Sequence, residues 1–185
     1  MTQQPASDRL AWIGNDSVAQ PLTDTGVVMC GACTAQRRCR LGVQRERLDG
    51  EVALFDLHCP RDHEGGPNVA HGGWTASVMD EMLGHVPLLH RQMTVTATLT
   101  VNFVKPVPVE RRLRARAWVD RVEGSKWFVS GELLLPPSDA VLATATGIWV
   151  ARDPSHFARH EKWLSEQGGQ VIVTPPSTMM VCPVT

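Results

Sequence analysis

The sequence predicts an α+β fold in which one buried helix packs on an antiparallel sheet. Three observations carry this prediction: an apolar helical pattern from Gly73 to His85, strict alternation of apolar and polar residues from Met93 to Val104, and short turns between the later strands. A doubly wound parallel sheet is excluded, because such a sheet needs a crossover helix after most of its strands.

Two strands are expected before the helix, at residues 41–48 and 51–59. They flank Asp49-Gly50, a strong hairpin signal, because glycine supplies the positive φ that the turn needs. A polar loop at residues 60–70 leads into the helix. Pro87 is expected to help end the helix, since proline has no amide hydrogen to donate.

Four strands are expected after the helix, at residues 93–104, 111–122, 126–135 and 140–150. In the first of them, Thr94, Thr96, Thr98 and Thr100 share one face, and β-branched residues favour strands. Before and after this domain, which we place at residues 41–152, we expect an irregular N-terminal arm at residues 1–40 and a C-terminal helix with its tail at 153–185. A length of 185 residues suits one such domain.

Composition is ordinary for a globular protein, with 43% apolar and 20% charged residues, which excludes intrinsic disorder. No apolar run approaches the roughly 20 residues of a transmembrane helix, and no signal-peptide pattern occurs, so we expect a cytoplasmic protein without a membrane partner. A net charge of −1 gives no general argument for nucleic acid. Between Lys105 and Lys126, however, seven basic residues stand against three acidic ones, which favours a small polyanionic ligand or, alternatively, a solvated strand face.

Five cysteines without a secretion signal argue against a disulfide framework. Cys30 and Cys33 have the spacing of half a zinc site, which Cys39, His58 and Cys59 could complete. A zinc-dependent interaction module is therefore an alternative, whereas our preferred interpretation includes no metal and no cofactor.

The residues whose chemistry points to a function are His71-Gly72-Gly73 at the helix start and Asp80 within the helix. Two glycines there let a ligand approach backbone N–H groups that have no helical partner, and these amides can stabilise negative charge on an oxygen. A turn needed only for packing is the alternative. Asp80 lies on a row of small residues, whereas its rival Glu81 points about 100° away around the helix.

The spacing of Gly73 and Asp80 predicts that the protein forms an oligomer. Gly73 and Asp80 are seven residues apart, about 10 Å along a helix axis. A catalytic base must come within about 3 Å of the reacting atoms, so one helix cannot bring both residues to one carbonyl. If both are catalytic, two antiparallel helices of two chains must face each other, and the protein is at least a dimer with two sites.

The stretch from His71 to Glu81, followed by the strand from Val95 to Lys105-Pro106, resembles the hotdog-fold acyl-CoA thioesterases of the PaaI-like group. The similarity runs from about Cys30 to Val150. It implies a curved antiparallel sheet around a central helix, a homodimer or a dimer of dimers, and hydrolysis of an acyl-CoA thioester.

The resemblance also implies roles for single residues. Gly73 matches the residue whose amide polarises the thioester carbonyl, and Asp80 matches the partner-chain carboxylate that acts as base or nucleophile. Thr96 matches a strand hydroxyl that orients water, and His71 matches a histidine that organises the loop. The chain departs from the pattern at Gly65, where many relatives carry Asn or Gln to hold the carbonyl.

Coenzyme A carries phosphates, and arginine binds phosphate with two-pronged contacts. The candidate coenzyme A-binding residues are Lys105, Arg112, Arg114, Arg116, Ser125 and Lys126. Two further functions on the same fold stay open: a protein that binds acyl-CoA without hydrolysing it, and a hydratase or dehydratase, whose Asp/His or His/Glu arrangement we cannot place. The sequence does not identify the acyl group of the substrate.

Overall fold

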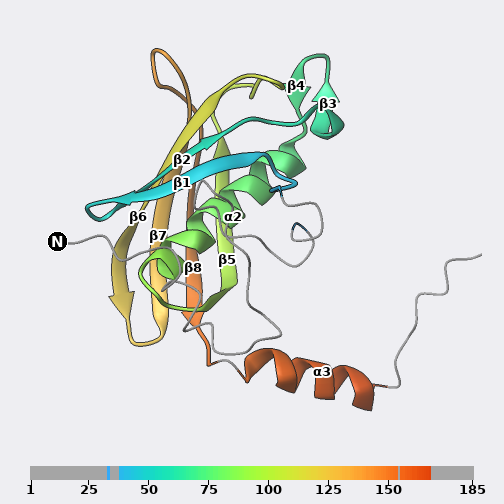
Figure 1. Cartoon of the computed structure of the whole chain (residues 1–185), viewed down its shortest axis with the longest axis vertical. Helices are drawn as coiled ribbons and strands as arrows, with labels where there is room; N and C mark the ends of the chain where they lie inside the picture. Colours follow the sequence, from blue (N-terminus) through green and yellow to red (C-terminus); the bar gives the residue numbers. More distant parts are fainter. Residues whose placement is uncertain (1–32, 34–37, 154, 168–185) are drawn as a thin grey trace, which may run out of the picture. The chain divides into compact units, whose positions relative to one another are not determined.

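The computed structural model of the chain describes residues 33, 38–153 and 155–167 (Figure 1). The chain divides into two compact units after residue 154, which are described separately. The expected N-terminal arm and C-terminal tail lie mostly outside the described residues. No helix in the described part is long and apolar enough to cross a membrane.

The first unit contains an antiparallel sheet that curves around one helix, α2 (Gly72–Leu89) (Figure 1). Among the described residues the sheet has six strands, in the order β1-β2-β6-β7-β8-β5. Their bounds are β1 (Val43–Asp49), β2 (Val52–Leu57), β5 (Thr94–Phe103), β6 (Leu113–Glu123), β7 (Lys126–Leu135) and β8 (Ala140–Ala151). The predicted fold class and the predicted order of strands around a central helix are confirmed.

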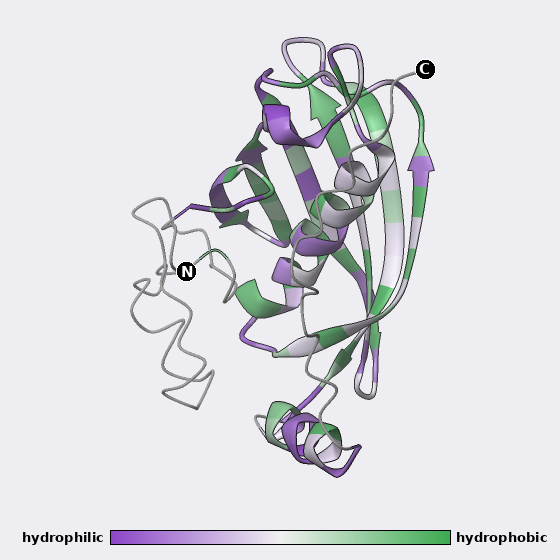
Figure 2. Cartoon of the chain, turned by 90° about the vertical axis from the view of Figure 1, so that its right-hand side faces the viewer, coloured by the Kyte–Doolittle hydropathy of each residue, from purple (hydrophilic) through white to green (hydrophobic). Residues whose placement is uncertain are grey.

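Apolar side chains of α2 fill the space between the helix and the sheet. Trp74, Val78, Met82 and Val86 recur at intervals of four residues and are at most 3% exposed. Figure 2 shows hydrophobic residues along several strands of the sheet that surrounds α2. Because α2 is buried along most of its length, residues on it are held rigidly, and a polar side chain there has a fixed environment.

The helix does not end at Pro87, as the sequence predicted, but continues to Leu89. Pro87 lies in the last turn, where it removes a single hydrogen bond, and its ring is buried in the core. The helix ends when Arg91 adopts a φ of 64° and its amide donates to the carbonyl of Leu88.

The strand β5 lies at one edge of the sheet and pairs only with β8 in the described residues. Its register shifts between Thr96 and Thr98, so the strict alternation predicted from Met93 to Val104 is interrupted by a bulge at Ala97. The predicted hairpin forms, with Gly50 at a φ of 61°, but its two loop residues are Gly50 and Glu51 because Asp49 still pairs with Val52.

The loop before α2 contains short elements that the sequence did not predict: η2 (Arg61–His63), β3 (Glu64–Gly66) and β4 (Val69–Ala70). The second unit contains α3 (His156–Glu166), close to the helix predicted at Pro154–Gln167. No residue of α3 is buried.

Candidate active site

Asp80 and Thr96 meet where the middle of α2 faces the edge strand β5. The Thr96 hydroxyl donates a hydrogen bond of 2.9 Å to Oδ1 of Asp80. The threonines Thr94, Thr98 and Thr100 were equal candidates by sequence. The structure places Thr96 against the carboxylate, just before the bulge in β5.

Asp80 is half-buried, and its surroundings shift its acidity. Burial raises the pKa of Asp80 above its ordinary value, and the neighbouring charge of Glu81 raises it further. The Thr96 hydrogen bond and the positive charge of His85 act in the opposite direction. A carboxylate with a raised pKa is a stronger base, which suits a group that takes a proton from water.

A hollow of about 310 Å³ opens beside Asp80. Polar groups of both signs face it together with apolar surface, so it can accommodate a substrate group and a water molecule. It is lined by Asp80, Glu81, Gly84, His85, Leu88, Thr94, Val95, Thr96 and Trp149.

At the start of α2, the His71 side chain caps the helix. Its Nδ1 accepts a 2.9 Å hydrogen bond from the amide of Gly73, while its own amide donates to the carbonyl of His63. The Gly73 amide, expected to polarise a substrate carbonyl, therefore already has an acceptor within its own chain. A substrate oxygen would have to share this amide or displace the imidazole.

The glycine at position 65 is required by packing. A Cβ there would lie 2.7 Å from Cα of His71, closer than side chains pack, so neither Asn nor Gln fits this loop as it is folded. The side-chain oxygen of Asn68, in the same loop, accepts a hydrogen bond from Arg61 at 3.3 Å. The loop thus holds His71 and leaves no side-chain amide at residue 65.

A second hollow of about 310 Å³ lies at the N-terminal end of α2. Gly72 and Thr75 of the helix and Lys105 after β5 contribute to it, beside Phe103 and Val104, which are 61% and 52% exposed. The start of α2, through Gly72, and Asp80 thus line different hollows of one chain. Of the residues expected to bind coenzyme A, Lys105 lies beside the helix start.

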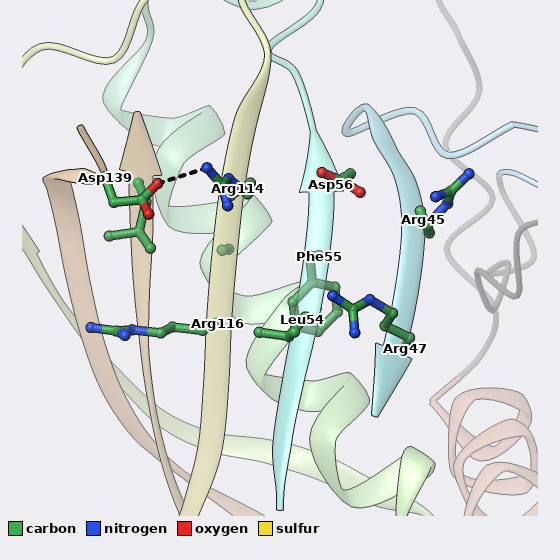
Figure 3. Close-up of a pocket in the computed structure, with 10 residues that line it drawn as sticks. Arg45, Arg47, Leu54, Phe55, Asp56, Arg114, Arg116 and Asp139 are labelled. Atoms are coloured by element: carbon green, nitrogen blue, oxygen red, sulfur yellow. Dashed lines mark ion pairs between the residues drawn. The ribbon is translucent and has the colours of Figure 1, made fainter. Parts of the chain in front are cut away.

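Arg114 and Arg116, two of the three predicted arginines, lie on the sheet face that points away from α2 (Figure 3). Each of the three pairs with an acid from another strand or turn: Arg112 with Asp56 at 3.1 Å, Arg114 with Asp139 at 3.2 Å, and Arg116 with Glu132 at 2.7 Å. Figure 3 shows Arg45 and Arg47 of β1 on the same face, across β2 from the arginines of β6. These ion pairs neutralise much of the positive charge that the sequence suggested.

Ser125 lies in the turn between β6 and β7, and Lys126 is the first residue of β7, at the opposite end of these strands from Arg114. Nine residues of paired strand separate Arg114 from Glu123, the partner of Lys126, which is about 30 Å. The six candidate coenzyme A-binding residues are therefore not brought together at one place.

Sequence reasoning missed a buried group of charges beside the candidate site. Nδ1 of His85 lies 2.6 Å from Oε2 of Glu46, and its Nε2 lies 3.4 Å from Oε1 of Glu81. The spacing of Glu81 and His85, four residues apart on a helix, was a visible signal. No pattern in the sequence indicated that Glu46 is buried, because a register shift between Val43 and Arg45 turns its side chain inward.

The cysteines proposed as zinc ligands behave as core residues where they are described. Cys33, Cys39 and Cys59 are buried, and Cys30 lies outside the described residues. No group of three His, Cys, Asp or Glu side chains among the described residues could hold a metal ion.

Comparisons with known proteins agree with this architecture. The family model of the thioesterase superfamily matches residues 67–138. An uncharacterized protein of Schizosaccharomyces pombe is 32% identical over 120 residues, which are 61% of this chain and 67% of that protein. Acyl-coenzyme A thioesterase THEM4 of Bos taurus is 31% identical over 91 residues, covering 49% of this chain and 37% of the bovine protein. The match thus spans little more than a third of that relative.

Two solved structures show the same fold. The PaaI protein of Escherichia coli, from the phenylacetic acid degradation operon, superposes with a TM-score of 0.57 at 19% identity, over 66% of this chain and 85% of that one. The protein smu.793 of Streptococcus mutans, bound to acetyl CoA, superposes with a TM-score of 0.57 at 15% identity, over 62% and 92%. The chain therefore has the hotdog fold and belongs to the thioesterase superfamily.

Proposed function

We propose that the protein is an acyl-CoA thioesterase that works as a homodimer or a dimer of dimers. The observation that carries this proposal is the half-buried Asp80 carboxylate, hydrogen-bonded to Thr96 at the wall of an open hollow. Two relatives add support: THEM4 is named an acyl-coenzyme A thioesterase, and smu.793 was solved with acetyl CoA.

In the proposed reaction, Asp80 of one protomer faces the start of α2 of its partner. As a general base, Asp80 takes a proton from water while the water oxygen adds to the thioester carbon. The partner's helix N-terminus stabilises the resulting oxyanion, the carbon–sulfur bond breaks, and the thiolate of coenzyme A takes up the proton. As a nucleophile, Asp80 would instead form a mixed anhydride that water then hydrolyses.

The edge position of β5 supports the proposed dimer. An edge strand presents unpaired backbone groups that a second chain can continue as a sheet, and β5 ends at the exposed apolar residues Phe103 and Val104. Thr96 lies on this strand, so pairing through β5 would place the Asp80 site at the interface. Lys105, beside the helix start, would meet a phosphate of coenzyme A.

The test is release of free thiol from short, long and aromatic acyl-CoAs by the full chain and its Asp80→Asn variant. We expect at least one substrate to be hydrolysed, with turnover lowered by several orders of magnitude in Asp80→Asn while the oligomer stays folded. A near-wild-type rate in the variant would remove Asp80 from the mechanism.

A second function, binding of acyl-CoA without hydrolysis, is favoured by one observation. The Gly73 amide donates to His71, and Gly65 supplies no side-chain amide to hold a carbonyl in its place. Calorimetric binding of a non-hydrolysable acyl-CoA thioether, without thiol release from any acyl-CoA in the panel, would establish this function instead.

A further inference from the structure

Three ionisable side chains form a buried row next to Asp80. The His85 imidazole lies between Glu46 of β1 and Glu81 of α2, at 2.6 Å and 3.4 Å. The Glu46 side chain is fully buried, that of His85 is 9% exposed, and that of Glu81 is 23% exposed. Glu81 and His85 also line the hollow beside Asp80, so the row ends at the candidate site.

The geometry indicates the charge of this row. A neutral imidazole has one donor and one acceptor nitrogen, whereas both ring nitrogens of His85 face carboxylate oxygens. Both nitrogens must carry hydrogen for both contacts to be favourable, which makes His85 an imidazolium. A buried carboxylate such as Glu46 also needs a cationic partner, because an unpaired buried charge is costly.

The acid–base properties of the neighbouring groups agree with this assignment. Burial would lower the pKa of His85, but Glu46 and Glu81 outweigh it and raise the pKa well above 6.5. Burial would raise the pKa of Glu81, but His85 lowers it. Burial raises the pKa of the nearby Cys39 thiol, so this group stays neutral. The charged groups around His85 in the described residues are thus Glu46, Glu81 and Asp80.

We propose that His85 is a positioning residue for Asp80: anchored by Glu46, it holds the Glu81 carboxylate and keeps a fixed positive charge five residues along α2 from Asp80. Its role for catalysis rests on the proposed function of Asp80. Without His85, the adjacent carboxylates of Asp80 and Glu81 would repel each other, and one of them would retain a proton at higher pH.

The test follows the Asp80 carboxyl group directly by carbon-13 NMR of the full chain labelled at aspartate, with Asp80→Asn to assign the signal. His85→Gln removes the cation. Glu46→Gln keeps the ring and an acceptor oxygen but removes the anchoring charge, and it serves as the second variant if His85→Gln fails to fold. His90→Gln, the same substitution at the end of α2, is the matched control.

We expect His85→Gln to raise the Asp80 titration midpoint by about one pH unit, Glu46→Gln to raise it by less, and His90→Gln to leave it in place. The acid limb of kcat/KM against pH should move by the same amount. An unmoved Asp80 midpoint in a folded variant would overturn the proposal, as would a rate loss equal at every pH.

The two proposals fail in different ways. If the wild type hydrolyses no acyl-CoA but the Asp80 midpoint moves, the proposed function is wrong and the electrostatic coupling stands. If the wild type is a thioesterase and the midpoint does not move, the positioning role of His85 is wrong.

Discussion

Replacing Thr96 by Val tests the bond on which the candidate site depends. Valine keeps the shape and branching of the side chain but removes the hydroxyl that donates to Asp80 at 2.9 Å. A hydrogen bond to a charged group is worth about 1.5–3 kcal/mol, and about 1.4 kcal/mol corresponds to one pKa unit. Thr96 lowers the pKa of Asp80, so its loss raises that pKa, by about one unit after allowance for solvent.

The effect of Thr96→Val on kcat/KM depends on pH, because only the ionised form of Asp80 reacts. The reaction needs the carboxylate, which is lost as pH falls through the pKa of Asp80. A raised pKa therefore moves the acid limb of kcat/KM to higher pH. At alkaline pH, where Asp80 is ionised in both proteins, the remaining loss should be about 10- to 100-fold if Thr96 also orients water.

Thiol release measured from pH 5 to 9 separates these two effects. Thr94→Val is the matched control, because Thr94 lines the same hollow but is not the donor to Asp80. The reasoning would be refuted if Thr96→Val and Thr94→Val gave the same profile, or if the acid limb of Thr96→Val stayed where it is in the wild type.

Three further predictions follow from distances and contacts. In Gly84→Ala, the new Cβ would lie 3.0 Å from Nε1 of Trp149, so the hollow narrows and kcat/KM should fall most for the bulkiest acyl-CoA in a chain-length series. Gly73→Pro removes one amide at a first-turn position that tolerates proline. Mixed with inactive Asp80→Asn, it should restore about a quarter of wild-type activity, because half of the dimers are mixed and each has one complete site; no recovery on subunit exchange would contradict the two-chain site. Lys105→Ala should raise KM for acyl-CoA several-fold and Arg116→Ala should not; equal effects in steady-state kinetics would count against the ion-paired state of Arg116.

The fold was predictable because its signals are local. Four-residue spacing along α2 indicates a buried face. Alternation along β5 indicates a strand, whose apolar residues Leu99 and Val101 are half-buried, and Asp49-Gly50 indicates a turn. Pro87 was misjudged because a proline in the last turn removes one hydrogen bond, and burial of its ring compensates for that loss. Propensity rules describe the isolated chain and contain no such compensation.

The site was predictable only in part, because its decisive contacts depend on register. The bulge at Ala97 selects Thr96 among four threonines, and the shift near Arg45 turns Glu46 toward His85. Both are insertions of one residue into a strand pair, which alternation patterns do not reveal. The ion pairs of the arginines could not be predicted for the same reason: their acidic partners stand on neighbouring strands, at positions fixed only by pairing.

Ion pairing in the structure changes how much free positive charge the basic segment offers to a ligand. Arg112, Arg114 and Arg116 count as three positive charges in the sequence, but each has a carboxylate within 3.2 Å. A phosphate would have to displace these partners, and exchanging one anion for another yields little net energy in water.

Lys105 differs because it stands beside the amides at the start of α2, where the helix dipole adds to its charge. We therefore expect anion binding to be stronger beside Lys105 and the helix terminus than at the ion-paired arginines. The phosphates of a coenzyme A thioester carry negative charge, and its carbonyl oxygen carries partial negative charge, so a positively charged site attracts both. In the proposed reaction, one chain's helix start orients the substrate. Asp80 lies about 10 Å further along the same helix, so the carboxylate in this reaction is the partner's.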